Sequence, residues 1–111
     1  MQIVFLTPHQ KPTSGGVNVI HAHASRLARR HDVTILVKQG RPRPIDSCQV
    51  AGFDDGPASA DVVVLPADMA DPGIVDAPRI TLLQGTERNL PFEESPTVLA
   101  NVSHGRRVIA C

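Results

Sequence analysis

Residues 1–37 read MQIVFLTPHQKPTSGGVNVIHAHASRLARRHDVTILV and carry the strongest structural signals in the chain. The run at residues 2–7 is apolar without alternation, which is typical of a strand covered on both faces in a parallel sheet. Residues 8–16 hold two prolines and then Ser-Gly-Gly, the composition of a loop. A second apolar run follows at residues 33–37, so the stretch predicts a strand, a loop, a helix and a parallel strand.

The helix of this βαβ unit is expected at residues 17–30. Arginines crowd its last turns, where the helix dipole favours positive charge, and His31-Asp32 ends it. The apolar residues recur at the spacing of one buried helix face, which comprises Val17, Ile20, Ala24, Leu27 and Ala28.

Beyond Gly40, prolines and glycines divide the chain into short segments. Short strands are expected at residues 47–53, 61–65, 79–84 and 97–102, with one helical turn at 67–70. A last helix is expected at residues 104–111, capped by Ser103. A chain that stops inside such a helix indicates a truncated domain. Together these elements predict one α/β domain over residues 1–111, an open doubly wound, mainly parallel sheet of the Rossmann or flavodoxin class.

The composition excludes several function classes. Eleven Lys and Arg balance eleven Asp and Glu among 111 residues, which argues against a nucleic-acid binder driven by counterion release. A local basic patch remains compatible with this balance. Aromatic residues are 3% of the chain, with no Trp or Tyr, so the stacking platforms of single-strand nucleic-acid binders are missing.

The compartment is expected to be the cytoplasm. No apolar run approaches the roughly 20 residues that cross a bilayer, and residues 1–6 lack the basic start of a signal peptide. Cys48 and Cys111 match neither a disulfide framework nor a zinc motif, so we interpret them as ordinary reduced thiols.

Ligands of open α/β sheets bind beyond the carboxyl ends of the strands, so the site is expected there. Gly15 and Gly16 stand at the start of the main helix, where exposed N–H groups and the dipole attract anions or polar oxygens. The alternative interpretation is a flexible entry to the helix without a ligand. Neither G-x-G-x-x-G nor a Gly-Lys-Ser/Thr phosphate loop is present, so both common nucleotide motifs are excluded.

The histidines differ in whether they are expected to contact a ligand. His21 and His23 are two residues apart, so on a helix they point about 200° apart and cannot clamp one metal ion. His21 falls on the buried edge of the helix and His23 on its wet face, which favours structural roles for both. His9 lies in the loop before the glycines and His104 follows a predicted strand, so both are candidates for ligand contact.

A second group of candidates follows the strand predicted at residues 79–84. Gln84, Gly85 and Thr86 combine an amide, a close backbone approach and a hydroxyl, which suit hydrogen bonds to sugar hydroxyls. Three acidic residues among prolines lack the spacing of a calcium loop, and we interpret them as solvated turn residues: Asp68, Asp71 and Asp76. No catalytic triad or nucleophile elbow is present, so catalytic residues stay unknown.

The chain resembles the amino-terminal half of group 1 (family four) glycosyltransferases of the GT-B fold. The resemblance rests on the apolar strand with Thr7-Pro8, on Gly15-Gly16-Val17 opening a helix, and on the second strand that starts at His31-Asp32-Val33. Later segments agree with it, namely Ala-Asp-Val-Val-Val at residues 60–64, Ile-Thr-Leu-Leu-Gln-Gly at 80–85 and Val-Leu-Ala-Asn-Val-Ser at 98–103.

The resemblance implies a retaining transfer of sugar from a nucleotide-sugar donor to a glycan or lipid-linked acceptor, as in polysaccharide biosynthesis. In that family this domain binds the acceptor, while its Gly-Gly loop faces the donor phosphates across the cleft. The family's positions carry over to Gly15, Gly16, Gln84, Gly85 and Ser103.

The chain departs from the family in two ways. Gln84-Gly85 stands where the family usually has a His, and the carboxyl-terminal donor domain with its Glu-x7-Glu motif is missing. We therefore expect this chain to be inactive alone. No cofactor is expected besides the nucleotide-sugar substrate, and no metal, because an Asp-x-Asp motif is missing.

The expected partners are the sugar acceptor and the nucleotide-sugar donor, with no nucleic acid. Peripheral contact with a membrane would come through a lipid-linked acceptor. Uncovered apolar surface near Val108-Ile109 favours a homodimer. The alternative function is a non-catalytic, flavodoxin-like module that binds a small molecule or a protein at the Gly15-Gly16 edge.

Overall fold

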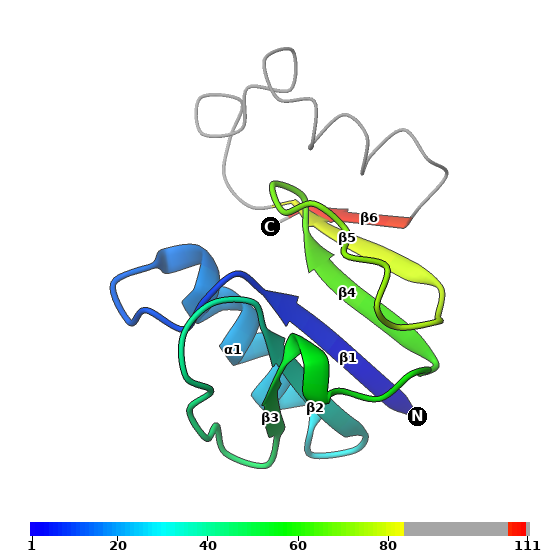
Figure 1. The fold of residues 1–111 in the computed structure, drawn as a ribbon, viewed down its shortest axis with the longest axis horizontal. Helices are drawn as coiled ribbons and strands as arrows, with labels where there is room; N and C mark the ends of the chain where they lie inside the picture. The colour runs from blue at the N-terminus through cyan, green and yellow to red at the C-terminus, as the bar shows by residue number, and fades with distance from the viewer. Residues whose placement is uncertain (84–106, 111) are drawn as a thin grey trace.

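The computed structural model of the chain describes residues 1–83 and 107–110 (Figure 1). In these ranges the chain forms six strands, one α-helix and one 3-10 turn. Their order is β1 (Gln2–Thr7), α1 (Gly15–Leu27), β2 (Asp32–Val37), β3 (Gln49–Gly52), η1 (Phe53–Asp55), β4 (Val62–Pro66), β5 (Arg79–Leu83) and β6 (Arg107–Ala110).

The six strands form one parallel sheet in the order β3-β2-β1-β4-β5-β6. From β1 the chain moves outward through β2 to β3, then returns to place β4 on the other side of β1. The strand order therefore reverses between β1 and β4. The βαβ unit predicted from residues 1–37 is confirmed, since β1 and β2 pair in parallel from Gln2↔Asp32 to Thr7↔Val37.

The sheet is covered differently on its two faces. On one face, Ile20 and Ala24 of α1 pack with Phe5 and Ile35 of the sheet in one buried cluster. On the other face, Leu36 and its neighbours are covered by irregular segments at residues 53–60 and 67–77. This arrangement explains why β1 is buried from Ile3 to Thr7 without alternation. The chain is thus an α/β protein with a parallel sheet, and the described residues contain one α-helix.

Helix α1 begins earlier and ends earlier than residues 17–30. Ser14 caps it, with its hydroxyl oxygen accepting the Val17 N–H at 3.3 Å, so both glycines belong to the first turn. After Leu27 the chain turns tightly toward β2, and the Leu27 carbonyl accepts the His31 N–H at 3.0 Å. The prediction that Leu27 is buried is wrong, because this turn leaves its side chain 36% exposed.

The strands predicted at residues 47–53, 61–65 and 79–84 correspond to β3, β4 and β5, with bounds that differ by a few residues. The helical turn predicted at 67–70 is a single turn in which the Met69 N–H donates to the Pro66 carbonyl at 3.2 Å. The strand predicted at 97–102 and the Ser103 cap lie outside the described residues.

The helix predicted at residues 104–111 is wrong over Arg107–Ala110, which form strand β6 beside β5. The β-branched pair Val108-Ile109 favours an extended backbone, and pairing with β5 satisfies its hydrogen bonds. The expectation of a truncated chain was inferred from that helix, so the helix no longer supports it.

Between η1 and β4 the chain passes over the sheet face opposite α1 (Figure 1). Gly56 lies so close to the sheet that a Cβ there would be 2.6 Å from both methyl carbons of Leu36. Because Leu36 is fully buried, a glycine is required for this close approach.

Among residues 1–83 and 107–110, no helix is long and apolar enough to cross a membrane.

Candidate functional site

The carboxyl ends of β1 and β2 continue side by side into two loops, which we call the carboxyl edge (residues 7–16 and 38–43). The Lys38 N–H donates to the Thr7 carbonyl at 3.0 Å, and the Gln39 N–H donates to the Pro8 carbonyl at 2.9 Å. The pairing of the two strands therefore extends past their ends and holds the start of both loops.

His9 is fixed within this edge by local hydrogen bonds. The buried Thr7 hydroxyl donates to the His9 carbonyl at 2.7 Å, and the Lys11 N–H donates to His9 Nδ1 at 3.1 Å. Because Nδ1 is occupied as an acceptor, Nε2 is the ring nitrogen through which the half-buried His9 would meet a ligand.

Gln10 joins the two loops of the carboxyl edge, a role that the sequence interpretation missed. Its side-chain amide donates to the Arg43 carbonyl at 3.1 Å and accepts the Arg43 N–H at 2.6 Å. The Arg43 guanidinium in turn donates to the Gln10 carbonyl. Only a buried position distinguishes this glutamine from a solvated one, and no sequence pattern marks it.

Gly15 and Gly16 form the exposed start of α1, where the first N–H groups of a helix have no partner within the helix. A Cβ added at Gly15 would meet no atom within 4 Å, and its φ is not in the left-handed region. Neither packing nor backbone strain therefore requires a glycine at Gly15. A close approach by another molecule would require one.

The carboxyl edge is locally basic although the chain is neutral overall. Its exposed cations are Lys11, Lys38, Arg41 and Arg43. One of them, Arg43, acts on His21 in α1, where burial lowers the pKa of the imidazole and the charge of Arg43 lowers it further. This basic loop pair beside the amino terminus of a helix can bind an anionic group.

The other predicted ligand contacts lie outside the described residues: Gln84, Gly85, Thr86, Ser103 and His104. Strand β5 is described as far as Leu83, directly before the first of them. The grouping of these residues with His9 and the glycines stays a prediction.

The predicted orientations of the helical histidines are confirmed. His21 is half-buried, with Nε2 buried and unpartnered, and His23 is exposed. Within the described ranges no three His, Cys, Asp or Glu side chains are grouped so as to hold a metal ion. Cys48 is a free thiol whose pKa is raised by burial, with a Ser25 hydrogen bond opposing and Asp46 adding to the rise.

One of the three predicted turn carboxylates has a structural role instead. Asp71 forms an ion pair with Arg79 at 2.9 Å, and the two side chains are only 14% and 12% exposed. The interpretation of Asp71 as a solvated turn residue is therefore wrong, while Asp68 and Asp76 are exposed.

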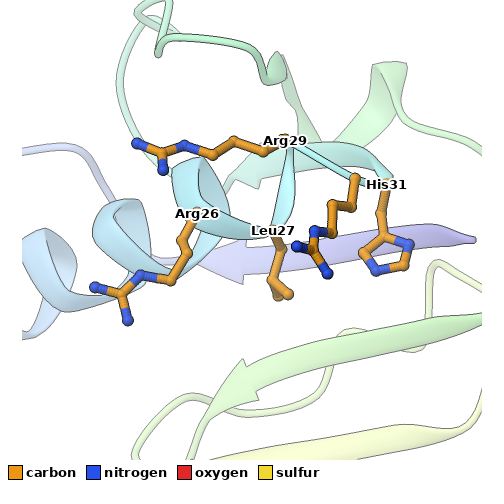
Figure 2. Close-up of a pocket in the computed structure, with 5 residues that line it drawn as sticks. Arg26, Leu27, Arg29 and His31 are labelled. Carbon is orange, nitrogen blue, oxygen red and sulfur yellow. The ribbon is translucent and has the colours of Figure 1, made fainter.

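A shallow cavity of about 300 Å³ lies at the other end of α1, lined by Arg26, Leu27, Arg29, Arg30 and His31 (Figure 2). Figure 2 shows Leu27 and His31 on one side of the chain and Arg29 on the opposite side. Because cations at a helix carboxyl terminus are favoured by its dipole, these arginines need no ligand to explain them.

A comparison of the chain with protein-family models, with curated proteins and with solved structures gave no match.

Proposed function

We propose that the chain is the acceptor-side domain of a GT-B glycosyltransferase, inactive alone. The complete enzyme would transfer a sugar from a nucleotide-sugar donor to a glycan or lipid-linked acceptor. The observation that carries the proposal is the strand order, which reverses between β1 and β4. Ligands of open parallel sheets bind outside the carboxyl ends of the strands at such a reversal, and doubly wound Rossmann sheets have this same order.

The loop that follows β1 leads from this reversal directly to α1, which supports the assignment. Its half-buried His9 offers Nε2, and Gly15 and Gly16 offer backbone N–H groups without side chains in front of them. Backbone donors and an imidazole suit both sugar hydroxyls and phosphate oxygens.

The charge of the carboxyl edge also supports the proposal. A nucleotide-sugar carries phosphates, and the edge presents four cations beside a helix amino terminus. Resemblance to the glycosyltransferase family places the donor mainly on a second domain. The carboxyl edge would then complete the cleft from the acceptor side.

The test is sugar transfer by the complete product of the gene, measured with a panel of radiolabelled nucleotide-sugars. Gly16→Val places a branched side chain at the exposed start of α1 and should lower kcat/KM by about tenfold or more. Ala22→Val adds a comparable bulk at an exposed position in the middle of the same helix, so it is the matched control. Circular dichroism checks that both variants keep their helix.

Three outcomes would overturn the proposal. The first is a complete gene product that transfers no sugar from any donor in the panel. The second is a Gly16→Val variant with the turnover of the unaltered protein. If the native gene product were no longer than this chain and bound a ligand by itself, the non-catalytic module would replace the enzyme.

A further inference from the structure

A second cavity lies on the sheet face opposite α1, toward the amino ends of the strands. It has a volume of about 540 Å³, within the range of small-molecule sites. Its floor is formed by β1, β2 and β3, and its wall is the segment at residues 55–57. Figure 1 shows this segment leaving η1 toward the start of β4.

The floor of this cavity is polar where a parallel sheet is normally apolar. Gln2 pairs with Asp32, and Thr34 pairs with Gln49, so the four residues are neighbours on adjacent strands. Further along the same face, the paired residues Leu6 and Leu36 are fully buried. Of the four polar residues, Thr34 is half-buried and the other three are exposed, so the cavity is a polar recess open to solvent.

The wall is held in place by the packing of Gly56 on Leu36. Because a Cβ at Gly56 would be 2.6 Å from the Leu36 methyl carbons, the backbone here lies directly on the sheet. The residues on either side, Asp55 and Pro57, line the cavity. The cavity is therefore formed before any ligand arrives, which reduces the entropic cost of binding.

Among the residues that the structure describes, the lining contains two carboxylates, Asp32 and Asp55, and no lysine or arginine. Within the described part of the chain, neither carboxylate forms an ion pair or a side-chain hydrogen bond, and the same holds for the side chains of Gln2, Thr34 and Gln49. Ala51 and Pro57 add apolar surface to the cavity. A complementary ligand must bring positive charge and hydrogen-bond donors on an aliphatic frame.

We propose that this cavity binds a small aliphatic diamine or polyamine. Its ammonium groups would pair with Asp32 and Asp55, with the two carboxamides as further acceptors, and its methylene chain would lie along Ala51 and Pro57. The site is at the opposite end of the strands from the carboxyl edge. It does not depend on the proposed glycosyltransferase function.

The experiment is isothermal titration calorimetry of the chain with 1,4-diaminobutane and with spermidine, at low ionic strength. 1,4-Butanediol has the same carbon frame without charge. It therefore distinguishes recognition of the ammonium charges from the fit of the ligand's carbon frame. We expect both amines to bind and the diol to give no heat of binding. Asp32→Asn and Asp55→Asn should each weaken amine binding about tenfold, the loss of one charged hydrogen-bonded pair.

Asp68→Asn is the matched control, because Asp68 is an exposed carboxylate outside the cavity. It should leave the amine affinity unchanged. If either cavity variant failed to fold, as judged by its melting temperature, Gln49→Ala removes an amide acceptor from the floor and should also weaken binding.

Four results would each overturn the assignment, of which three concern the amines and their controls. These three are the lack of amine binding at millimolar concentration, equal binding of the diol, and an Asp68→Asn loss as large as that of the cavity variants. A titration with sugars that gave tighter binding than spermidine would also overturn it in favour of a polyol site.

Discussion

His21 is a half-buried imidazole on the flank of α1, and its Nε2 atom is buried without a partner. Burial lowers its pKa below the ordinary value of 6.5, and the nearby charge of Arg43 lowers it further. In the pH window between the lowered value and 6.5, the unfolded chain therefore binds more protons than the folded chain. The contribution of His21 to stability is present in full above this window and is lost as the pH falls through it.

We expect His21→Gln to reduce the fall in the free energy of unfolding between pH 7.5 and 5.5, about the range in which histidines titrate. Urea denaturation across this range measures the slope. His23→Gln, an exposed histidine of the same helix, is the matched control for losing an imidazole from α1. A slope in His21→Gln equal to that of the unaltered chain would contradict the prediction.

At the scale of elements, the segment between β4 and β5 is organised by one side chain. The Arg79 guanidinium pairs with Asp71 at 2.9 Å and donates to the carbonyls of Val75 and Ala77 at 2.5 and 2.8 Å. This places an irregular segment over the sheet, where Val75 packs in the core. The side chain of Arg79 thus supplies hydrogen bonds that hold this irregular segment in place.

Arg79→Ala should lower the free energy of unfolding by about 2–3 kcal/mol, because it leaves a largely buried carboxylate and two carbonyls without their donor. Urea denaturation measures this difference. The control is Arg41→Ala, which removes an exposed arginine and should stay within about 0.5 kcal/mol of the unaltered chain. Equal stabilities of the two variants would show that the pair does not hold the segment.

The sequence predicts elements well where local pattern and packing agree. The run at residues 2–7 matches β1 because burial on both faces leaves an uninterrupted apolar signature. The sequence wrongly predicts a helix at the end of the chain, because the apolar pair Val108-Ile109 is too short to show a period. Strand β6 depends on pairing with β5. Tertiary pairing of this kind has no local signal.

For the candidate site, too, the sequence predicts the features that depend on local residues and misses those that depend on distant ones. The place of Gly15 and Gly16 at the start of α1 can be predicted from the local sequence. The structure confirms it, with Ser14 as the residue that caps the helix. The role of Gln10 depends on Arg43, a residue 33 positions away, and could not be read from either segment alone. The cavity at the amino ends of the strands could not be predicted from the sequence either, because it forms only when β3 aligns Gln49 with Thr34.

On the scale of the whole molecule, the strands differ in how well they are enclosed. β1 lies between β2 and β4, with α1 on one face and irregular segments on the other. β3 stands at the end of the strand order, and its residues are half-buried or exposed. Local opening should therefore start at β3 and reach β1 only with global unfolding.

Hydrogen exchange followed by NMR tests this order. Amides of Val4, Phe5 and Leu6 should exchange at least about tenfold more slowly than the amides of β3 that bond to β2. Because β1 and β3 belong to the same molecule in the same sample, the comparison contains its own control. Equal protection of the two strands would mean that the sheet opens as a single unit.

The Gln10–Arg43 contact has a mechanical consequence for the carboxyl edge. Hydrogen bonds in both directions tie the loop after β1 to the loop after β2, and the strand pairing ties their first residues as well. Neither loop can swing outward alone without breaking several bonds at once. A force that a bound molecule exerts on the loop of His9 is therefore transmitted directly to the loop of Arg43.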